Sequence, residues 1–182
     1  MSENKVAFPN YMYVIIVKEA HTAKLSLGSE GKITYQLALS NDKKHIFISL
    51  IGSGSQGYFS HEWINADLII DILGELSERA DAFTSKVFRS VFVGRSSNNA
   101  PFLAAALLAE KLLDRDGKYE TRLRAIKDGA GWKKALLTLK GKPIQVRLDG
   151  KPITTPLCAN EPSAKGKDED DEDDGHDSDS PE

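Results

Sequence analysis

The sequence predicts a single α+β domain, in which an N-terminal antiparallel β-meander packs against two to three helices and a C-terminal β-hairpin follows. Three observations support this class: apolar side chains alternate with a period of two over residues 11–51, apolar stripes with helical spacing follow, and short turn sequences separate the strands. With 182 residues, 40% of them hydrophobic, the chain suits one domain with a real core. We place this domain at residues 1–154 and a Pro- and Ser-containing linker with a disordered acidic tail at 155–182.

The N-terminal strands are predicted from alternation and β-branched content. We expect strands over residues 11–17, 23–27, 32–39 and 45–51. The third of these is the clearest, because Ile33, Tyr35, Leu37 and Leu39 fall on one face. Glycines at 28 and 31 and the pair Asn41-Asp42 supply turn residues, and such short links favour antiparallel pairing.

Two helices are predicted from their apolar stripes and end signals. Asn65 is a suitable N-cap for a helix with Asp67 in its first turn and a stripe that extends to Ala80. A second helix is expected over 100–114, with Asn98 or Asn99 as its cap. Its surface is apolar nearly all round, so we expect it to be largely buried.

The remaining segments carry weaker patterns. The β-branched and aromatic content of residues 86–93 favours a strand over a helix. We expect a polar helix over 118–127 and a β-hairpin over 133–148, followed by a tight turn at Asp149-Gly150.

The charge distribution is the most informative feature for function. The chain has 24 basic and 27 acidic residues, but ten of the acidic ones lie in the last fifteen positions, which contain no Lys or Arg. The remainder therefore has 24 basic and 17 acidic residues, and residues 110–151 have twelve basic and six acidic. A basic region followed by a polyanionic tail indicates a binding protein whose tail competes for its own basic surface.

The basic region contains the candidate nucleic-acid-binding residues. Lys111, Arg115, Lys118 and Arg122 would share one face if the second helix continued through Gly117. The full predicted set is Lys111, Arg115, Lys118, Arg122, Arg124, Lys127, Lys133, Lys134, Lys140, Lys142 and Arg147, with Trp132 as an aromatic partner. Such residues neutralise backbone phosphates, and Trp132, Tyr119 or Tyr58 could stack on bases. The alternative interpretation of the same residues is an ordinary solvated surface.

These patterns predict a non-enzymatic nucleic-acid-binding accessory protein, tolerant of sequence, that binds single-stranded DNA or RNA. The alternative is a protein-interaction module (an adaptor, inhibitor or chaperone) whose tail engages a basic partner surface. The partner-binding residues of the tail would be Asp168, Glu169, Asp170, Asp171, Glu172, Asp173 and Asp174.

The layout of a basic body and an acidic C-terminal tail resembles that of bacterial single-stranded-DNA-binding proteins. This chain ends Asp177-Ser-Asp-Ser-Pro-Glu182, without the apolar C-terminal tip of those proteins, and the body shares none of their sequence. The resemblance therefore concerns the layout alone.

No catalytic, cofactor or metal signature is predicted. Gly52, Gly54 and Gly57 match the Gly-x-Gly-x-x-Gly spacing, but Tyr58 to Trp63 would open a helix poorly, so we interpret the segment as a connecting loop. Four histidines without ligand spacing and a single cysteine, Cys158, indicate neither a zinc site nor a disulfide. We find no apolar run of membrane-spanning length and no signal peptide, and we expect a cytoplasmic protein.

Overall fold

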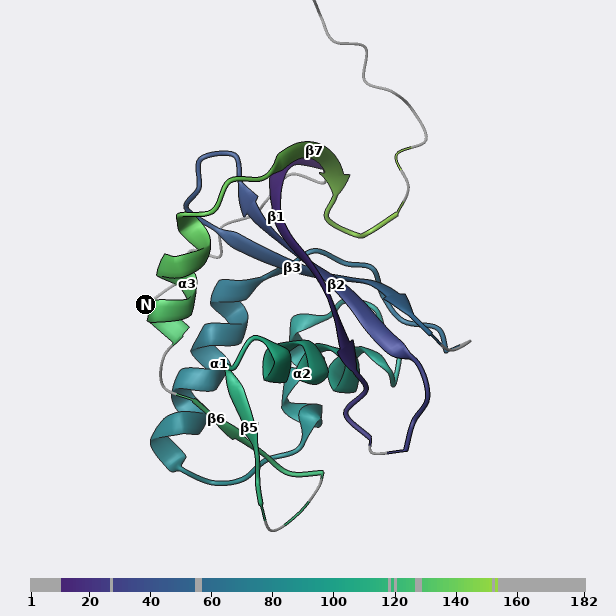
Figure 1. The fold of residues 1–182 in the computed structure, drawn as a ribbon, viewed down its shortest axis with the longest axis vertical. Helices are drawn as coiled ribbons and strands as arrows, with labels where there is room; N and C mark the ends of the chain where they lie inside the picture. The colour runs from purple at the N-terminus through teal and green to yellow at the C-terminus, as the bar shows by residue number, and fades with distance from the viewer. Residues whose placement is uncertain are drawn as a thin grey trace, which may run out of the picture.

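The computed structural model describes residues 11–26, 28–54, 57–117, 119, 121–126, 129–151 and 153. An antiparallel sheet dominates it, with the strand order β4-β3-β2-β1-β7 (Figure 1). The strands are β1 Tyr11–Ala23, β2 Lys32–Ser40, β3 Ile46–Ser53, β4 Ile64–Asn65 and β7 Lys142–Arg147. The predicted α+β class and the N-terminal meander are confirmed. The predicted linker and acidic tail lie outside the described residues.

Helices and a small hairpin lie on one face of this sheet (Figure 1). These elements are α1 Ala66–Arg79, the 3-10 helix η1 Ser85–Val91, α2 Asn99–Ala109, the hairpin β5 Leu113–Arg115 with β6 Leu123–Ala125, and α3 Gly129–Leu137. The core between them and the sheet includes Tyr35, Leu37, Phe88 and Leu103, each at most 1% exposed. As its nearly all-round apolar surface predicted, α2 is buried along most of its length.

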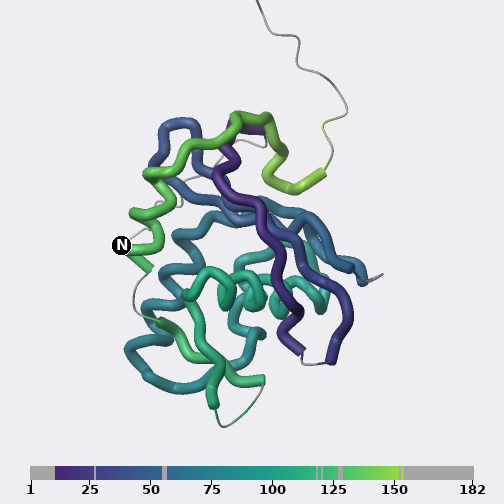
Figure 2. Tube along the Cα trace, viewed as in Figure 1, coloured from purple at the N-terminus to yellow at the C-terminus, as the bar shows by residue number. Residues whose placement is uncertain are grey.

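The sheet curls so that the end of β7 approaches the beginning of β4. Figure 2 shows the chain leaving α3 and returning to the sheet as β7, where it pairs with β1. The opposite face of the sheet has a smaller core of Val14, Ala38, Phe47 and Val146. Beyond β7, the carbonyl of Leu148 accepts a hydrogen bond of 2.9 Å from the amide of Trp63, which immediately precedes β4.

The end signals of α1 and of the early turns are as predicted. Asn65 is the N-cap of α1 and its side chain accepts a hydrogen bond from the amide of Asp67 at 3.0 Å. Gly31 has φ +85°, and a Cβ there would lie 2.8 Å from the backbone of Gly54, so no larger residue fits this close approach. The turn at Asp149-Gly150 is also present, with Gly150 at φ +70°.

Two strand predictions are wrong. The predicted strand at 23–27 does not exist as a separate element, because β1 continues as one strand to Ala23 through a bulge between Ile16 and Lys18. Residues 86–93 form no strand: residues 86–91 belong to η1, and the chain leaves it at Phe92. Its Phe88 is fully buried and packs edge-on against Phe83 at 6.2 Å, and Val87 and Val91 also pack against the core, so side-chain burial rather than strand pairing with any described residue holds this segment.

The predicted helix over 100–114 is too long. The chain reverses after Ala109, where the amide of Leu112 bonds the carbonyl of Leu107 and the amide of Lys111 bonds that of Leu108. This pair of bonds is a Schellman motif, and Lys111 occupies its left-handed position with φ 59°. Glycine normally marks that position, so the sequence contained no stop signal.

The predicted helix over 118–127 and hairpin over 133–148 are also wrong. Leu123 pairs with Phe83 and with β5, so its surroundings convert 123–125 into a strand. Residues 129–137 are helical because Trp132, Leu136 and Leu137 pack against the helix-side core. Only the second half of the expected hairpin exists, as β7, and it extends the sheet. In the described part of the chain, no helix is long and apolar enough to cross a membrane.

Candidate nucleic-acid interface

The predicted basic region forms two separate surfaces in the structure. Residues 111–124 belong to the β5–β6 hairpin at one end of the molecule, and residues 132–142 belong to α3 and its link to β7 near the other end (Figure 1). Because α2 ends at Ala109, Lys111 and Arg115 do not share a helical face with Arg122. Lys118 and Lys127 lie outside the described residues.

The arginines of the hairpin are engaged by backbone carbonyls. Arg122 donates to the carbonyl of Ala82 at 3.1 Å, and Arg124 donates to that of Ala80 at 2.9 Å. Arg124 also pairs with Asp116 at 3.1 Å, and Arg115 donates to the carbonyl of Leu25 at 2.8 Å. Arg122 and Arg124 satisfy carbonyls that follow α1, and Arg115 satisfies one that follows β1, so these exposed side chains hold the hairpin against its neighbours.

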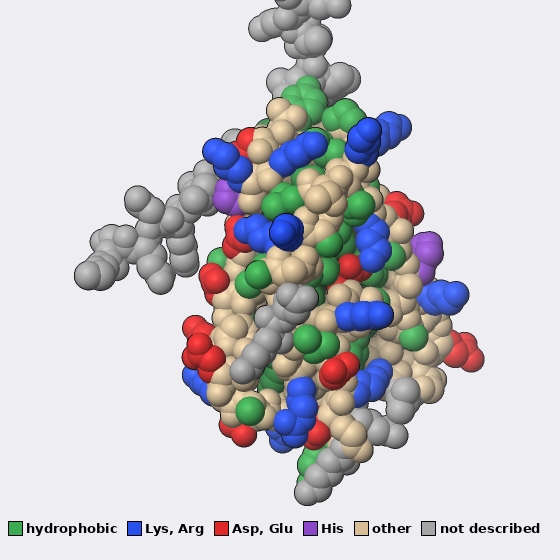
Figure 3. Space-filling model, turned by 60° about the vertical axis from the view of Figure 1, so that its left-hand side comes forward, with side chains coloured by type: hydrophobic (Ala, Val, Ile, Leu, Met, Phe, Trp, Pro, Cys, Tyr) green, Lys and Arg blue, Asp and Glu red, His purple; other side chains and the backbone are tan. Residues whose placement is uncertain are grey.

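The lysines of the second surface, on α3 and its link to β7, are exposed. Two further lysines from the β2–β3 turn lie beside them. We define the α3 face as Lys43, Lys44, Lys133, Lys134, Lys140 and Lys142. All are exposed except Lys133, whose side chain is 31% exposed. Figure 3 turns the side of the molecule that bears α3 toward the viewer, and basic side chains gather over its upper part.

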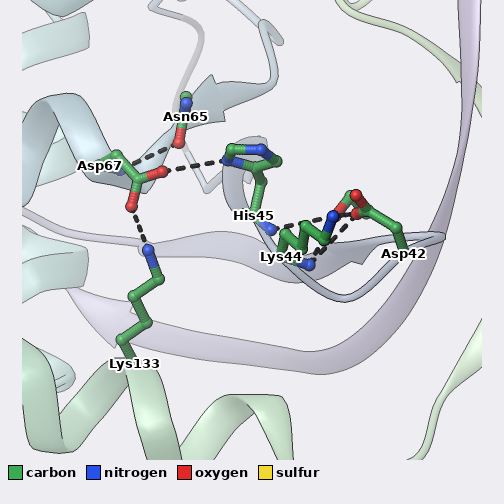
Figure 4. A network of polar contacts seen from close by, with 7 residues as sticks. Asp42, Lys44, His45, Asn65, Asp67 and Lys133 are labelled. Carbon is green, nitrogen blue, oxygen red and sulfur yellow. Dashed lines mark hydrogen bonds and ion pairs between the residues drawn. The ribbon is translucent and has the colours of Figure 1, made fainter. Parts of the chain in front are cut away.

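A network centred on Asp67 joins α3 to the β2–β3 turn (Figure 4). Asp67, at the beginning of α1, accepts from Nζ of Lys133 at 2.5 Å and contacts Nδ1 of His45 at 3.1 Å. Partial burial raises the pKa of Asp67, but the hydrogen bonds from Lys133 and His45 outweigh it, so this pKa is lower than usual. The carboxylate therefore fixes the turn that bears Lys43 and Lys44 next to α3.

The β2–β3 turn has its own carboxylate. Asp42 accepts from the hydroxyl of Ser40 and from the amide of Lys44, and these bonds lower the pKa of Asp42 (Figure 4). Lys43 adopts φ 55°, a left-handed conformation that this pattern stabilises. The side chains of Lys43 and Lys44 both remain exposed.

The link from α3 to β7 passes directly over β1. A Cβ at Gly141 would lie 2.0 Å from the carbonyl oxygen of Ile16, so only glycine allows this approach. Gly141 separates Lys140 from Lys142, and both lysine side chains remain exposed on either side of the crossing.

The side chain of Trp132 packs toward the interior. Its Nε1 donates to Glu110 at 3.1 Å, and the ring packs against the helix-side core. Glu110, 4% exposed, also pairs with Lys18 at 2.6 Å and accepts from the hydroxyl of Tyr35. Burial and the adjacent Glu110 raise the pKa of Tyr35. Trp132 is therefore a donor to a buried carboxylate, and we no longer assign it a stacking role.

The exposed aromatic nearest to the α3 face in the sheet is Tyr13. It is 58% exposed and lies on the same side of β1 as Ile15, which packs against the helix-side core. Tyr11 is 40% exposed and is covered by the guanidinium of Arg147, 5.2 Å from its ring centre. Arg147 in turn pairs with Asp149 at 2.6 Å and lowers the pKa of Asp149 to about 2. No sequence signal singled out Tyr13.

The glycine pattern and the histidine near it have structural roles. Gly54 packs against Gly31 and its amide donates to the carbonyl of Lys32 at 2.9 Å. Nδ1 of His61 contacts the carbonyl of Leu50 at 2.9 Å. Within the described ranges, no three His, Cys, Asp or Glu side chains are grouped so that they could hold a metal ion.

Comparison with known proteins gives no relative. No protein-family model, curated protein or solved structure matches this chain. The function must therefore be argued from the site itself.

Proposed function

We propose that this chain is a non-enzymatic, sequence-tolerant nucleic-acid-binding protein that contacts single-stranded nucleic acid through the α3 face. The observation that carries the proposal is the convergence of six lysines from three segments, of which the β2–β3 turn is far from the other two in the sequence. Two of these segments, the β2–β3 turn and α3, are tied together through Asp67. The proposal retains Lys133, Lys134, Lys140 and Lys142 of the predicted residues and adds Lys43 and Lys44.

The charge of the α3 face is available to a ligand. Among the described residues, Lys133 is the one member that forms an ion pair, with Asp67. The nearby carboxylate of Asp42 is occupied by Ser40 and by a backbone amide. Each lysine that contacts a phosphate releases a counterion, and this release is favourable whatever the base sequence.

The exposed ring of Tyr13 supports a single strand as the ligand. Stacking of a base on an aromatic side chain contributes about 1–3 kcal/mol and needs an unpaired base. Tyr13 lies on the helix side of the sheet and pairs with Gln145, three residues along β7 from Lys142 of the α3 face. Lysines along a backbone with one stacking ring beside them form the arrangement that sequence-tolerant single-strand binding requires.

The acidic tail is the proposed competitor for this face. Its ten acidic residues could cover six lysines when no nucleic acid is bound, and they lie outside the described residues. The screening length is roughly 8–10 Å near physiological salt, so the competition requires close contact and weakens as salt increases.

The test is a salt titration of binding to a labelled single-stranded oligonucleotide. We expect the triple variant K134E/K140E/K142E to lower the slope of log K against log salt by about 2, because each single-strand phosphate contact contributes about 0.7. The matched control K32E/K86E/K111E makes the same charge change at exposed lysines outside the α3 face and leaves the slope within about 0.5.

Equal losses in the two triple variants would contradict the assignment of the α3 face. Comparing residues 1–182 with residues 1–164 tests the tail in the same assay. Tighter binding by the shorter chain supports competition. Absence of binding by both chains at about 50 mM salt would exclude the nucleic-acid function, because electrostatic binding is strong at that salt concentration.

A further inference from the structure

An apolar groove lies beside β4, at the edge of the sheet away from the α3–β7 link. We call it the β4 groove; its volume is about 510 Å³ and its apolar walls include Phe47, Trp63, Ile64, Leu68, Val93 and Leu148. It lies between the loop after η1, the beginning of α1 and the turn after β7. The α3 face contributes none of its lining residues.

The groove is preformed and leaves apolar surface exposed. Glu62 accepts hydrogen bonds from the amides of Val93 at 2.8 Å and Gly94 at 2.7 Å, which fix the wall formed by the loop after η1. Nevertheless Val93 is 89% exposed and Leu68 is 45% exposed. A contiguous exposed apolar patch of this kind marks a place where another segment packs.

The start of β1 brings one end of the chain to this groove. Tyr11 pairs with Arg147, and the next two residues along the other strand, Leu148 and Asp149, both line the groove. The segment before Tyr11 contains Val6-Ala7-Phe8-Pro9, an apolar run outside the described residues. Phe8 is three residues from Tyr11, so a chain at about 3.3–3.6 Å per residue reaches roughly 10 Å from it.

The alternation of side chains along β1 indicates toward which face of the sheet Phe8 points. Met12 and Val14 belong to the outer-face core, together with Phe47, Trp63 and Leu148. In an extended chain Phe8 has the same phase as Met12 and Val14, because side chains two residues apart point to the same side. Three walls of the groove, Phe47, Trp63 and Leu148, lie on that side.

The other end of the chain is a poorer candidate. Ile153 lines a separate hollow of about 300 Å³ with Ser49 and Ile51, and it does not line the β4 groove. We therefore propose that residues 6–9 of the same chain dock in the β4 groove with Phe8 as the anchor. This inference is independent of the proposed nucleic-acid function.

Disulfide trapping tests the docking directly. In the background C158S, which removes the only native cysteine, the pair A7C/V93C keeps Phe8 and places one thiol beside it and one on the groove wall. Val93 is 89% exposed, so the folded domain tolerates cysteine there. Mild oxidation at low protein concentration is followed by non-reducing electrophoresis and intact mass, which separate intramolecular from intermolecular disulfides.

We expect intramolecular A7C–V93C disulfide to form at least about tenfold faster than in the same chain with Phe8→Ser, because docking raises the effective concentration of the two thiols above that of a free tether. The matched comparison is V93C with native Cys158, which samples the C-terminal segment and should also be about tenfold slower.

Three results would overturn the proposal. Equal rates in the chains with and without the Phe8→Ser substitution would show that the segment is not anchored by this residue. Equally fast V93C–Cys158 bonding would assign the groove to the C-terminal segment. Intermolecular dimers that disappear with Phe8→Ser would assign it to the N-terminal segment of a second copy.

Discussion

The β5–β6 hairpin and the α3 face are both basic, and four of the six lysines of the α3 face follow the hairpin closely in the sequence, yet the charges of the two regions are used differently. The hairpin carries arginines, and Arg115, Arg122 and Arg124 all donate to backbone carbonyls of other segments. The α3 face carries only lysines, and in the described part of the chain five of the six form no ion pair. A planar guanidinium with five donors suits fixed carbonyls, whereas an ammonium on a flexible stem remains hydrated.

The net charge of a segment of the sequence therefore does not measure the charge that is available to a ligand. Residues 110–151 contain twelve basic side chains, but the structure places those described on the hairpin and those described on α3 and its link at two ends of the molecule, and the hairpin arginines bond to backbone carbonyls. It also adds Lys43 and Lys44, which lie some ninety positions earlier than α3. We therefore expect substitutions in the hairpin to reduce the stability of the fold, and substitutions on the α3 face to reduce nucleic-acid binding.

The largest effect should come from Gly141→Ala, which breaks the α3 face by moving its backbone. The added Cβ would meet the carbonyl oxygen of Ile16 at 2.0 Å, so the link must lift away from β1. We expect a loss of about 2–3 kcal/mol in the free energy of unfolding, measured with urea, together with weaker oligonucleotide binding. Gly74→Ala is the control, because a Cβ there meets nothing within 4 Å. Equal stability of the two variants would show that the crossing does not depend on glycine.

The next effect concerns the hairpin. Arg122→Ala with Arg124→Ala removes the donors to the carbonyls of Ala82 and Ala80. The double variant should lower the free energy of unfolding by only about 1–2 kcal/mol, since both residues are exposed. Oligonucleotide affinity, measured where the variant is fully folded, should change less than about twofold. A large loss of affinity with unchanged stability would reverse the roles assigned to the two regions.

A smaller effect should separate stacking from charge on the α3 side. Tyr13→Ser removes a ring that is 58% exposed, and we expect single-strand affinity to fall about five- to tenfold, which corresponds to one modest stacking contact. Fluorescence anisotropy with single-stranded and duplex oligonucleotides of the same length checks this. Tyr119→Ser, at a ring 54% exposed on the hairpin side, is the control. An identical loss with duplex would argue against stacking.

The smallest effect should be the pH dependence that Asp67 confers on the α3 face. Its pKa is lower when folded than when unfolded, so its stabilising contribution is complete above the unfolded value near 4 and disappears as pH falls through the lower folded value. Asp67→Asn should therefore flatten the acid limb of stability by less than about 1 kcal/mol, because the site is well solvated. Urea titrations at pH 3 and pH 7 measure it, with Asp71→Asn, at an exposed position of the same helix, as the control. A steeper acid limb in Asp67→Asn would contradict the sign.

Strong local patterns were sufficient for much of the fold. The alternation of Ile33, Tyr35, Leu37 and Leu39 predicted β2, all four side chains being at most 1% exposed. The Asn65 cap and the continuous apolar surface of α2 likewise identified two helices. In each case the signal lies within a few residues of the element that it specifies.

The segment from Lys111 to Leu139 was not predictable in this way. Lys111 takes the left-handed position that glycine usually marks, Leu123 becomes a strand residue by pairing with Phe83, and Trp132 is helical where it meets Glu110. The candidate site was therefore only partly predictable. Four of its lysines were predicted from the basic composition of the segment, but their separation from the hairpin arginines depends on those long-range contacts.

The sequence by itself determined the α+β class, the meander, the two capped or apolar helices, and the contrast between a basic body and an acidic tail. These follow from periodicity and composition, which are local properties of the chain. Only the tertiary structure decided which cations are engaged by partners within the protein, because carbonyls after α1, the carboxylate of Asp67 and the contact of Gly141 with β1 are brought to them by folding. Whether a charged side chain is available to a ligand depends on the groups that surround it in the fold, and those groups are distant in the sequence.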